Sequence, residues 1–189
     1  MKEILRQNII KRLGKLPSQL EEVLDCFREN EVSRKTPVLL AGEVCQQCYF
    51  ITHGSFKIVR TTEAGEDHTL GLIFDEEWFT ALDSFRNNTP ATESIIASED
   101  TQFLSLSKER FTYLSREVTD FNTVYRQMLE ESQADLLDRV NNLMALDALA
   151  RLKYFQKKYP QALARINARE IASHLDMTPE TLSRLRTKI

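Results

Sequence analysis

Three polar side chains near the C-terminal end of the sequence have the chemistry needed to contact DNA bases. Glu180, Ser183 and Arg184 share one face of a short helix that is predicted to begin after Thr178. Arginine can donate two hydrogen bonds to guanine O6 and N7, glutamate can accept one from cytosine N4, and the serine hydroxyl can do either. The sequence therefore offers these three residues as candidate base contacts in a major groove.

Candidate contacts with DNA phosphates surround the same helix. Thr178 and Thr181 lie at its predicted N-terminus, where hydroxyl and backbone N–H groups favour an anion. The basic candidates are Arg169, Arg186 and Lys188. No β-wing segment follows the helix in this sequence, so we expect the phosphate contacts to come from the helices themselves.

Two short helix signatures position these side chains. Asn167 is a favoured N-cap, and Glu170, three residues later, completes a capping-box pattern. Thr178 then caps a second helix with Pro179 at its first position. Such short helices must pack on one another. In a helix-turn-helix we expect Ile171, Leu175, Leu182 and Leu185 to face inward, and Glu180, Ser183, Arg184 and Thr187 to face outward. A plain αα-hairpin is the alternative that the pattern leaves open.

The distribution of charge supports a separate C-terminal module. Residues 151–189 contain nine Lys or Arg and three Asp or Glu, for a formal net charge of +6. The rest of the chain contains 16 basic and 25 acidic residues, for a net charge of −9. A basic end on an acidic body is typical of a phosphate-binding module attached to a regulatory domain.

The preceding residues predict a β domain. An amphipathic helix is expected over 18–30, and strands from Thr36 onward. In "CYFITHGSFKIVRTT" we expect one strand with Phe50, Gly54, Phe56 and Ile58 on one side. This strand forms a hairpin with "HTLGLIF", and two more strands flank residues 98–100. Short strands at intervals of about ten residues indicate a jelly roll or barrel.

Helical periodicity returns after residue 107. A short helix is expected at "SKERFTYLS", and a long one over 120–146. Leu129, Leu136, Val140 and Leu143 recur in the long helix at near-heptad spacing, although Gln133 interrupts the seam. The seam favours a dimer helix, and a stripe that packs within one subunit is the alternative. Asp147 is a predicted N-cap for the next helix, which Pro160 ends.

The stretch "REIASHLDMTPETLSRLR" closely resembles the helix-turn-helix of the cyclic-AMP receptor protein/Fnr (Crp/Fnr) family of bacterial transcription regulators. Its "ETLSR" matches the family's E-x-x-S-R motif, which implies that Glu180, Ser183 and Arg184 contact bases. Residues 39–74 resemble the family's β-roll sensor domain in the pattern formed by Gly42, Glu43, Tyr49, Phe50, Ile51 and Gly54.

The resemblance covers nearly the whole chain and implies an α+β fold in three parts. Residues 1–117 would form a double-stranded β-helix, or jelly roll, of the cyclic-nucleotide-binding type. Residues 118–146 would form the dimerisation helix. Residues 147–189 would form a winged-helix-like helix-turn-helix domain whose wing is absent or reduced.

Two departures from the family pattern bear on function. Thr80 and Ala81 stand where a Gly-Glu pair would hold the ribose, and Ala91 and Thr92 stand where an Arg-Ser/Thr pair would hold the cyclic phosphate. A buried phosphate would therefore lack its partner, and we do not expect cyclic AMP to be the ligand. Asp176 replaces the usual glycine of the turn, in a left-handed conformation that aspartate tolerates.

An effector pocket is still expected in this part of the β-roll. Its candidate residues are Phe79, Thr80, Ala81, Arg86, Ala91 and Thr92. Arg86, five residues before Ala91, is an alternative partner for a phosphate. The sequence does not identify the effector.

The remaining reactive residues suggest no catalytic centre. Cys26, Cys45 and Cys48 are too few for a disulfide framework or for an iron–sulfur cluster with four cysteine ligands, and free thiols are favoured over a redox or metal role. His53, His68 and His174 form no ligand constellation. We predict no cofactor and no metal site, and we do not expect an enzyme.

The sequence thus predicts a homodimeric transcription regulator that binds a pseudo-palindromic DNA site, with RNA polymerase as a further possible partner. A ligand-binding β-roll with a vestigial DNA-binding end is the competing hypothesis. No apolar run approaches the roughly 18 residues of a membrane span, and no secretory signal is evident, so a cytoplasmic location and no membrane partner are expected.

Overall fold

Two antiparallel four-stranded sheets form a jelly roll between two groups of helices in the computed structural model, which describes residues 1–63 and 65–188. One sheet has the strand order β1-β8-β3-β6 and the other the order β2-β7-β4-β5. The strands are β1 (Arg28–Val32), β2 (Pro37–Leu39), β3 (Gln47–His53), β4 (Phe56–Thr61), β5 (Asp67–Ile73), β6 (Trp78–Phe79), β7 (Ser94–Ala97) and β8 (Thr101–Ser107). We call residues 28–107 the β-roll.

The predicted hairpin is confirmed: β4 pairs antiparallel with β5, from Phe56 opposite Ile73 to Thr61 opposite Asp67. The single strand predicted across residues 48–62 is wrong. Gly54 has a φ of 108°, and its backbone N–H donates to Asp75 Oδ1 at 2.7 Å. The chain turns there, so β3 and β4 belong to different sheets, and residues 50 and 56 are not on one strand.

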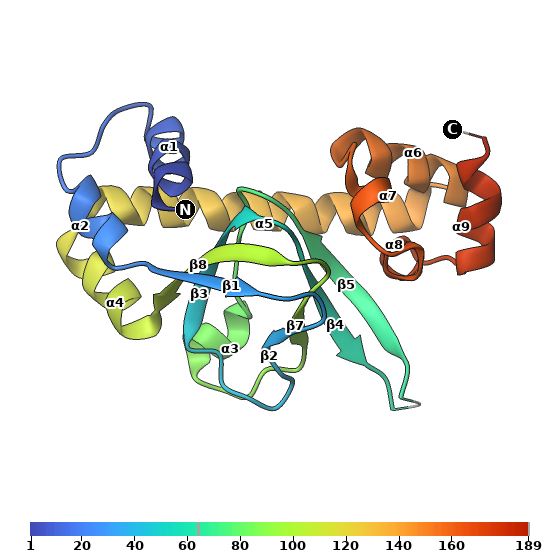
Figure 1. The fold of residues 1–189 in the computed structure, drawn as a ribbon, viewed down its shortest axis with the longest axis horizontal. Coiled ribbons are helices and arrows are strands. Elements are labelled where there is room, and N and C mark those ends of the chain that lie inside the picture. The colour runs from blue at the N-terminus through green and yellow to red at the C-terminus, as the bar shows by residue number, and fades with distance from the viewer. Residues whose placement is uncertain (64, 189) are drawn as a thin grey trace.

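Helices lie at both ends of the β-roll along the long helix α5, and the short helix α3 lies within the β-roll (Figure 1). They are α1 (Lys2–Leu13), α2 (Leu20–Asp25), α3 (Leu82–Asn87), α4 (Lys108–Glu117), α5 (Thr119–Ala145), α6 (Ala148–Lys158), α7 (Ala162–Arg165), α8 (Ala168–His174) and α9 (Pro179–Arg186). The helix predicted over 18–30 ends at Asp25, because residues 28–32 pair with β8 instead. Pairing with a neighbouring strand outweighs a local helical pattern here.

Two hydrophobic cores lie along α5. The larger one fills the β-roll and joins it to α1, α2, α4 and the first turns of α5, through fully buried residues such as Phe50, Phe56 and Leu114. The second core lies within α6–α9, which we call the helix-turn-helix unit. Leu72 and Phe74 of the β-roll belong to this second core, so the two parts are joined by apolar contacts.

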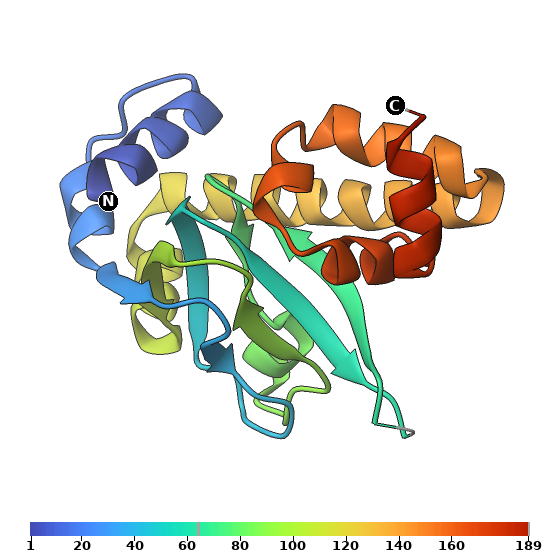
Figure 2. The same ribbon diagram turned by 45° about the vertical axis from the view of Figure 1, so that its right-hand side comes forward.

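The predicted long helix is confirmed with bounds of 119–145, and it connects the two cores (Figure 2). Phe121 and Val124 are buried near its N-terminus, whereas Leu136, Leu137, Val140 and Met144 are exposed. The later part of the helix therefore presents an apolar face that the same chain leaves uncovered. The stripe is not packed within one subunit along its whole length.

Candidate nucleic-acid interface and junction cavity

The two C-terminal helices are set by the capping residues that the sequence predicted. Asn167 Oδ1 accepts from the backbone N–H of Arg169 at 2.8 Å, and Thr178 Oγ1 accepts from that of Thr181 at 3.2 Å. Asp147 caps α6 in the same way, 2.8 Å from the N–H of Ala150. Side-chain acceptors satisfy N–H groups that a helix start leaves unpaired, which fixes where each helix begins.

The turn between α8 and α9 is a Schellman motif centred on Asp176. Asp176 adopts a left-handed φ of 53°, as predicted. The Met177 N–H donates to Ala172 O at 3.0 Å, and the Asp176 N–H donates to Ser173 O at 3.2 Å. These bonds close the last turn of α8 and direct the chain into α9.

The inward and outward faces agree with the prediction. Ile171, Leu175, Leu182 and Leu185 are buried, and Glu180, Ser183, Arg184 and Thr187 are exposed. The capping box is wrong: Glu170 does not return to Asn167, and its Oε1 instead accepts from Lys57 Nζ of β4 at 3.0 Å. The long-range ion pair takes the place of the predicted local hydrogen bond.

The outward face of α9 is chemically available. Arg184 is exposed and forms no ion pair with a described residue. The pKa of Glu180 is lowered by its own backbone N–H at the helix start and by the Thr178 hydroxyl, so its carboxylate is ionised at neutral pH. An ionised acceptor, a hydroxyl and a guanidinium thus stand together on one exposed surface, as base recognition requires.

The candidate phosphate-binding side chains differ in whether they are already bound within the protein. Thr178 Oγ1 donates to Thr181 Oγ1 at 3.2 Å, so these two hydroxyls bond to one another. Arg186 Nη2 donates to Leu163 O at 2.9 Å, which ties that side chain to α7. Arg169 and Lys188 are exposed and have no ion pair among residues 1–63 and 65–188.

The helix-turn-helix unit is attached to the β-roll by contacts that sequence reasoning missed. Arg165 donates to Asp75 Oδ2 at 2.5 Å and to Glu99 Oε1 at 2.7 Å. The Thr69 N–H donates to Ser173 Oγ at 2.8 Å. No local pattern marks Arg165, because its partners lie 66 and 90 residues away in the sequence.

Arg139 of α5 joins all three parts of the molecule. Its guanidinium donates to the carbonyl oxygens of Leu70 in β5 and His174 in α8, the latter at 3.3 Å. Burial lowers the pKa of this arginine. The same desolvation, with the charge of Arg139, lowers the pKa of His174 to about 3, so the imidazole is neutral. No sequence pattern marked Arg139, because its partners lie 35 and 69 residues away in the sequence.

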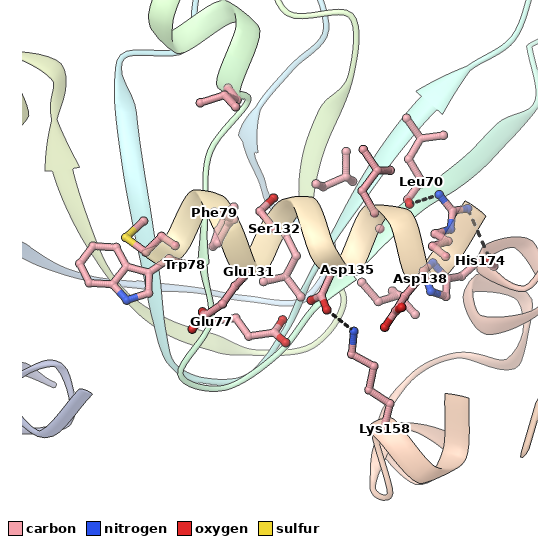
Figure 3. A pocket seen from close by; sticks show the side chains of 18 of the residues that line it. Leu70, Glu77, Trp78, Phe79, Glu131, Ser132, Asp135, Asp138, Lys158 and His174 are labelled. Atoms are coloured by element: carbon pink, nitrogen blue, oxygen red, sulfur yellow. Dashed lines mark hydrogen bonds and ion pairs between the residues drawn. The ribbon is translucent and has the colours of Figure 1, made fainter. Parts of the chain in front are cut away.

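A cavity of about 360 Å³ runs along α5 between the β-roll and α6, and we call it the junction cavity (Figure 3). Its volume lies within the range of small-molecule sites. Of the predicted effector residues, Phe79 and Thr80 line it, and the Thr80 hydroxyl donates to Gln47 O at 2.8 Å.

The other predicted effector residues do not line the junction cavity. Ala81 and Ala91 are buried in the β-roll, and Arg86 is exposed on α3. Thr92 is exposed, and its hydroxyl accepts from Arg60 Nη2 at 2.7 Å. The structure therefore does not bring these four residues together with Phe79 and Thr80 around the cavity.

Glu77 is the most perturbed acid on the cavity wall. It follows β5, and its Oε2 accepts from the backbone N–H of Phe74 at 2.9 Å. Burial raises the pKa of Glu77 to about 7, and the nearby Asp135 charge adds to this effect. No sequence pattern marked Glu77, because its environment is formed by α5 and α6.

The cysteines behave as buried or partly buried thiols. All three are free, and burial raises the pKa of Cys48 to about 12. Among the described residues, no group of three or more His, Cys, Asp or Glu side chains is arranged to hold a metal ion. No helix in the described ranges is both long and apolar enough to cross a membrane.

Comparisons with known proteins agree with this architecture. Residues 29–117 match the family of cyclic nucleotide-binding domains. The cyclic AMP receptor protein of Thermus thermophilus is 25% identical over 180 residues, covering 91% of this chain and 81% of its own length. FixK2 from Bradyrhizobium japonicum has a similar fold, with a TM-score of 0.75 at 15% identity over 86% of this chain and 83% of that one.

The fold also resembles that of the c-di-GMP-responsive global regulator CLP from Xanthomonas campestris, with a TM-score of 0.71 at 18% identity over 90% of this chain and 89% of that one. By their names, one of these proteins is a cyclic AMP receptor and another is a global regulator. Residues 29–117 thus match a cyclic nucleotide-binding domain, and the chain is similar in sequence to a cyclic AMP receptor protein and in fold to a global regulator.

Proposed function

We propose that the protein is a homodimeric transcription regulator that binds a specific DNA sequence through α9. The exposed set of Glu180, Ser183 and Arg184 on a fully capped helix-turn-helix is the observation that carries this proposal. The first helix of such a motif crosses the DNA backbone while the N-terminal part of the second enters the major groove. Arg169 at the start of α8 is then suited to a phosphate contact.

The electrostatics of the unit favour a polyanion. Two of the nine basic residues in the range 151–189, Lys158 and Arg165, form ion pairs with acids elsewhere in the chain. Lys57 of the β-roll neutralises Glu170 in turn. The cations that remain on the surface, among them Arg169, Arg184 and Lys188, leave the unit positively charged, and phosphate contacts of this kind dominate affinity for DNA.

The exposed apolar face of α5 supports the proposed dimer. Leu136 and Leu137 are 61% and 55% exposed, and Val140 lies on the next turn at 42%. Leucines and valines at such spacing along a helix are the pattern of a two-stranded coiled coil. A two-fold dimer would bind a pseudo-palindrome with half-sites about one helical turn, roughly 34 Å, apart. RNA polymerase in the cytoplasm is the further partner that we expect for such a protein.

Cyclic AMP is not the effector in this proposal. The position of the phosphate-binding pair is occupied by Ala91, which is buried, and by Thr92, which is exposed. Arg60 approaches Thr92, but it lies on the outside of β4 and also faces Glu93 at 3.7 Å. A cyclic phosphate in the β-roll interior would therefore be desolvated without a cation beside it.

The test is selection of bound sequences from a random duplex library by the purified protein, repeated with Arg184→Ala and with Arg116→Ala as a matched control on exposed α4. We expect a palindrome that Arg184→Ala blurs at one base pair, with a loss of about 1–3 kcal/mol in binding, and that Arg116→Ala leaves intact. A palindrome that Arg184→Ala does not change would contradict base contact by α9. Absence of any enriched sequence would favour the alternative, a β-roll with a vestigial DNA-binding end.

A further inference from the structure

Glu77 is a largely shielded carboxylate on the wall of the junction cavity. One of its oxygens accepts from the Phe74 N–H, and it forms no ion pair with any residue in the described ranges. Lys158, whose charge lowers the pKa of Glu77, is already paired with Asp135 at 2.6 Å. A buried carboxylate without a counter-ion is costly, and it is stabilised by any cation that reaches it.

The surrounding charges reinforce this negative end of the cavity. Glu131 and Asp135 of α5 also line it, and Figure 3 shows both on the same side of the cavity as Glu77. Arg12 pairs with Glu131 at 2.7 Å, and Lys158 pairs with Asp135. Three acids therefore face two bases at this end, which leaves one negative charge when Glu77 is ionised.

Two further positive residues of the cavity wall, Arg139 and Arg151, bind backbone carbonyl oxygens. Arg139 donates to the carbonyl of Leu70, and Figure 3 shows Leu70 and His174 far along the wall from Glu77. Arg151 donates to Leu146 O at 3.3 Å and to Asp176 O at 3.1 Å. The Nη atoms of these two guanidinium groups therefore bind backbone carbonyl oxygens, and their buried Nε atoms have no hydrogen-bond partner among the described residues.

The remainder of the wall is suited to an apolar body. It includes Ile58, Leu72, Ile73, Phe79 and Phe155. Burial of such a body contributes about 25 cal/mol per Å² of apolar surface. A ligand that suits both parts of the cavity has an apolar or aromatic body and one positively charged end.

We propose that the junction cavity binds a small organic ammonium ion, with Glu77 as its counter-ion and the apolar wall around its body. This inference rests on the proposed function, because it names the chemical class of the effector.

Ionisation of Glu77 makes binding of the ammonium ion depend on pH. The groups that face Glu77 are the Phe74 N–H of its own loop, Asp135 of α5, and Lys158 and Tyr159 at the end of α6. Its pKa near 7 means that the carboxylate gains its charge across neutral pH. Affinity for an ammonium ion should therefore rise between pH 6 and pH 8, where an aliphatic amine stays protonated.

The experiment uses three probes of one shape on the full-length protein without DNA: 4-phenylbutylamine, 4-phenylbutanol and 4-phenylbutyrate. Calorimetry measures each dissociation constant at pH 8, and amide NMR follows the Phe74 N–H that donates to Glu77. We expect the amine to bind about tenfold more tightly than the alcohol, and the carboxylate most weakly. The Phe74 resonance should move with the amine.

Two variants locate the effect. Glu77→Gln keeps an acceptor for the Phe74 N–H and removes the charge, so it should weaken amine binding about tenfold and abolish its pH dependence. Glu76→Gln, an exposed neighbour in the same loop that does not line the cavity, should change neither. Equal binding of amine and alcohol, or an unchanged affinity in Glu77→Gln, would overturn the proposal.

Failure of this inference is distinguishable from failure of the proposed function, because the probes are measured without DNA. Amine binding by a protein that enriches no DNA sequence would preserve the cavity assignment alone. Enrichment of a palindrome by a protein that binds none of the probes would preserve DNA recognition and overturn the cavity assignment. The same negative result is expected if a second copy of the chain fills the cavity.

Discussion

Arg165 Nη2 lies 2.7 Å from Oε1 of Glu99 and joins two parts of the chain that are 66 residues apart. The same Glu99 oxygen accepts from the Ser55 hydroxyl at 2.7 Å, so the carboxylate is held by the β-roll as well. Arg165 also donates to Asp75, and its pKa is raised by this hydrogen bond. The helix-turn-helix unit is therefore tied to the β-roll through one guanidinium and two carboxylates.

Replacing Arg165 by methionine should lower the stability of the whole protein. The change removes a partly buried charge-assisted network but leaves its two carboxylates able to reach solvent, so we expect a loss of about 1–3 kcal/mol in the free energy of unfolding. Urea denaturation at neutral pH measures it. Arg116→Met, on the exposed face of α4, is the control and should stay within about 0.5 kcal/mol of the parent. Equal effects of the two changes would show that the network contributes nothing.

The same network makes the stability of the folded protein depend on pH. Burial opposes ionisation of Asp75, but hydrogen bonds from Arg165 and from the Gly54 N–H outweigh it, and the pKa of Asp75 is lowered. A carboxylate whose pKa is lower in the folded state contributes stability above its unfolded pKa, and that stability is lost as the pH falls through the folded value. The stability that Asp75 contributes is therefore present at neutral pH and lost at acid pH, and Arg165→Met should reduce it.

The sequence could predict whatever depended on neighbouring residues. The caps at Asn167 and Thr178 and the turn at Asp176 lie within three residues of the groups they bind. The local sequence was therefore enough to predict them. The capping box failed because Lys57, more than a hundred residues away, competes for Glu170. Such competition is decided by the tertiary fold.

The candidate cavity was less predictable than the candidate DNA interface, because residues far apart in the sequence form its walls. Phe79 and Thr80 were expected there, but Glu77 owes its properties to burial by α5 and α6. Strand register was similarly ambiguous, since the alternation around Gly54 fits one long strand or two short ones. Only the assignment of the two strands to different sheets resolves it.

Gly54 should be nearly irreplaceable within the β-roll. A Cβ at this position would lie 2.8 Å from Thr101 Cα and 2.9 Å from Asp100 O, on a backbone whose φ of 108° disfavours any other residue. We expect Gly54→Ala to cost about 3 kcal/mol, from strain and overpacking together. Thermal unfolding measures the loss.

Gly42→Ala is the matched control for this change. Gly42 has a φ of 91°, but its Cβ would meet nothing within 4 Å. Its cost should be backbone strain alone, about 1–2 kcal/mol. If Gly42→Ala were as damaging as Gly54→Ala, contact with Thr101 would not be the cause.

Placing a charge at Leu136 should abolish the proposed dimer. Leu136→Glu puts a carboxylate into the apolar face of α5, where a coiled-coil partner would desolvate it without a cation. We expect light scattering on a sizing column to give the dimer mass for the parent and the monomer mass for the variant. Leu16→Glu, at an equally exposed leucine between α1 and α2, should remain a dimer. A parent that is monomeric would contradict the dimer directly, whatever the variants do.

Glu77 should make the protein less stable as the pH rises through neutrality, even without a ligand. The unfolded chain releases this proton near pH 4.5, whereas the folded protein keeps it until about pH 7. Between these values the unfolded state binds fewer protons, so the free energy of unfolding falls with increasing pH. The shift corresponds to a loss of roughly 3 kcal/mol across the range. Glu77→Gln has no proton to release and should escape this loss.

The comparison is made by urea denaturation of the parent, Glu77→Gln and Glu76→Gln between pH 4 and pH 8. The difference in the free energy of unfolding between Glu77→Gln and the parent should grow with pH and level off above pH 7, because Glu77 is then ionised in both folded and unfolded states. Glu76→Gln should follow the parent, because that side chain is exposed in the same loop. Parallel curves for Glu77→Gln and the parent would mean that burial by α5 and α6 does not hold a proton on Glu77, and that its carboxylate is already charged at pH 6.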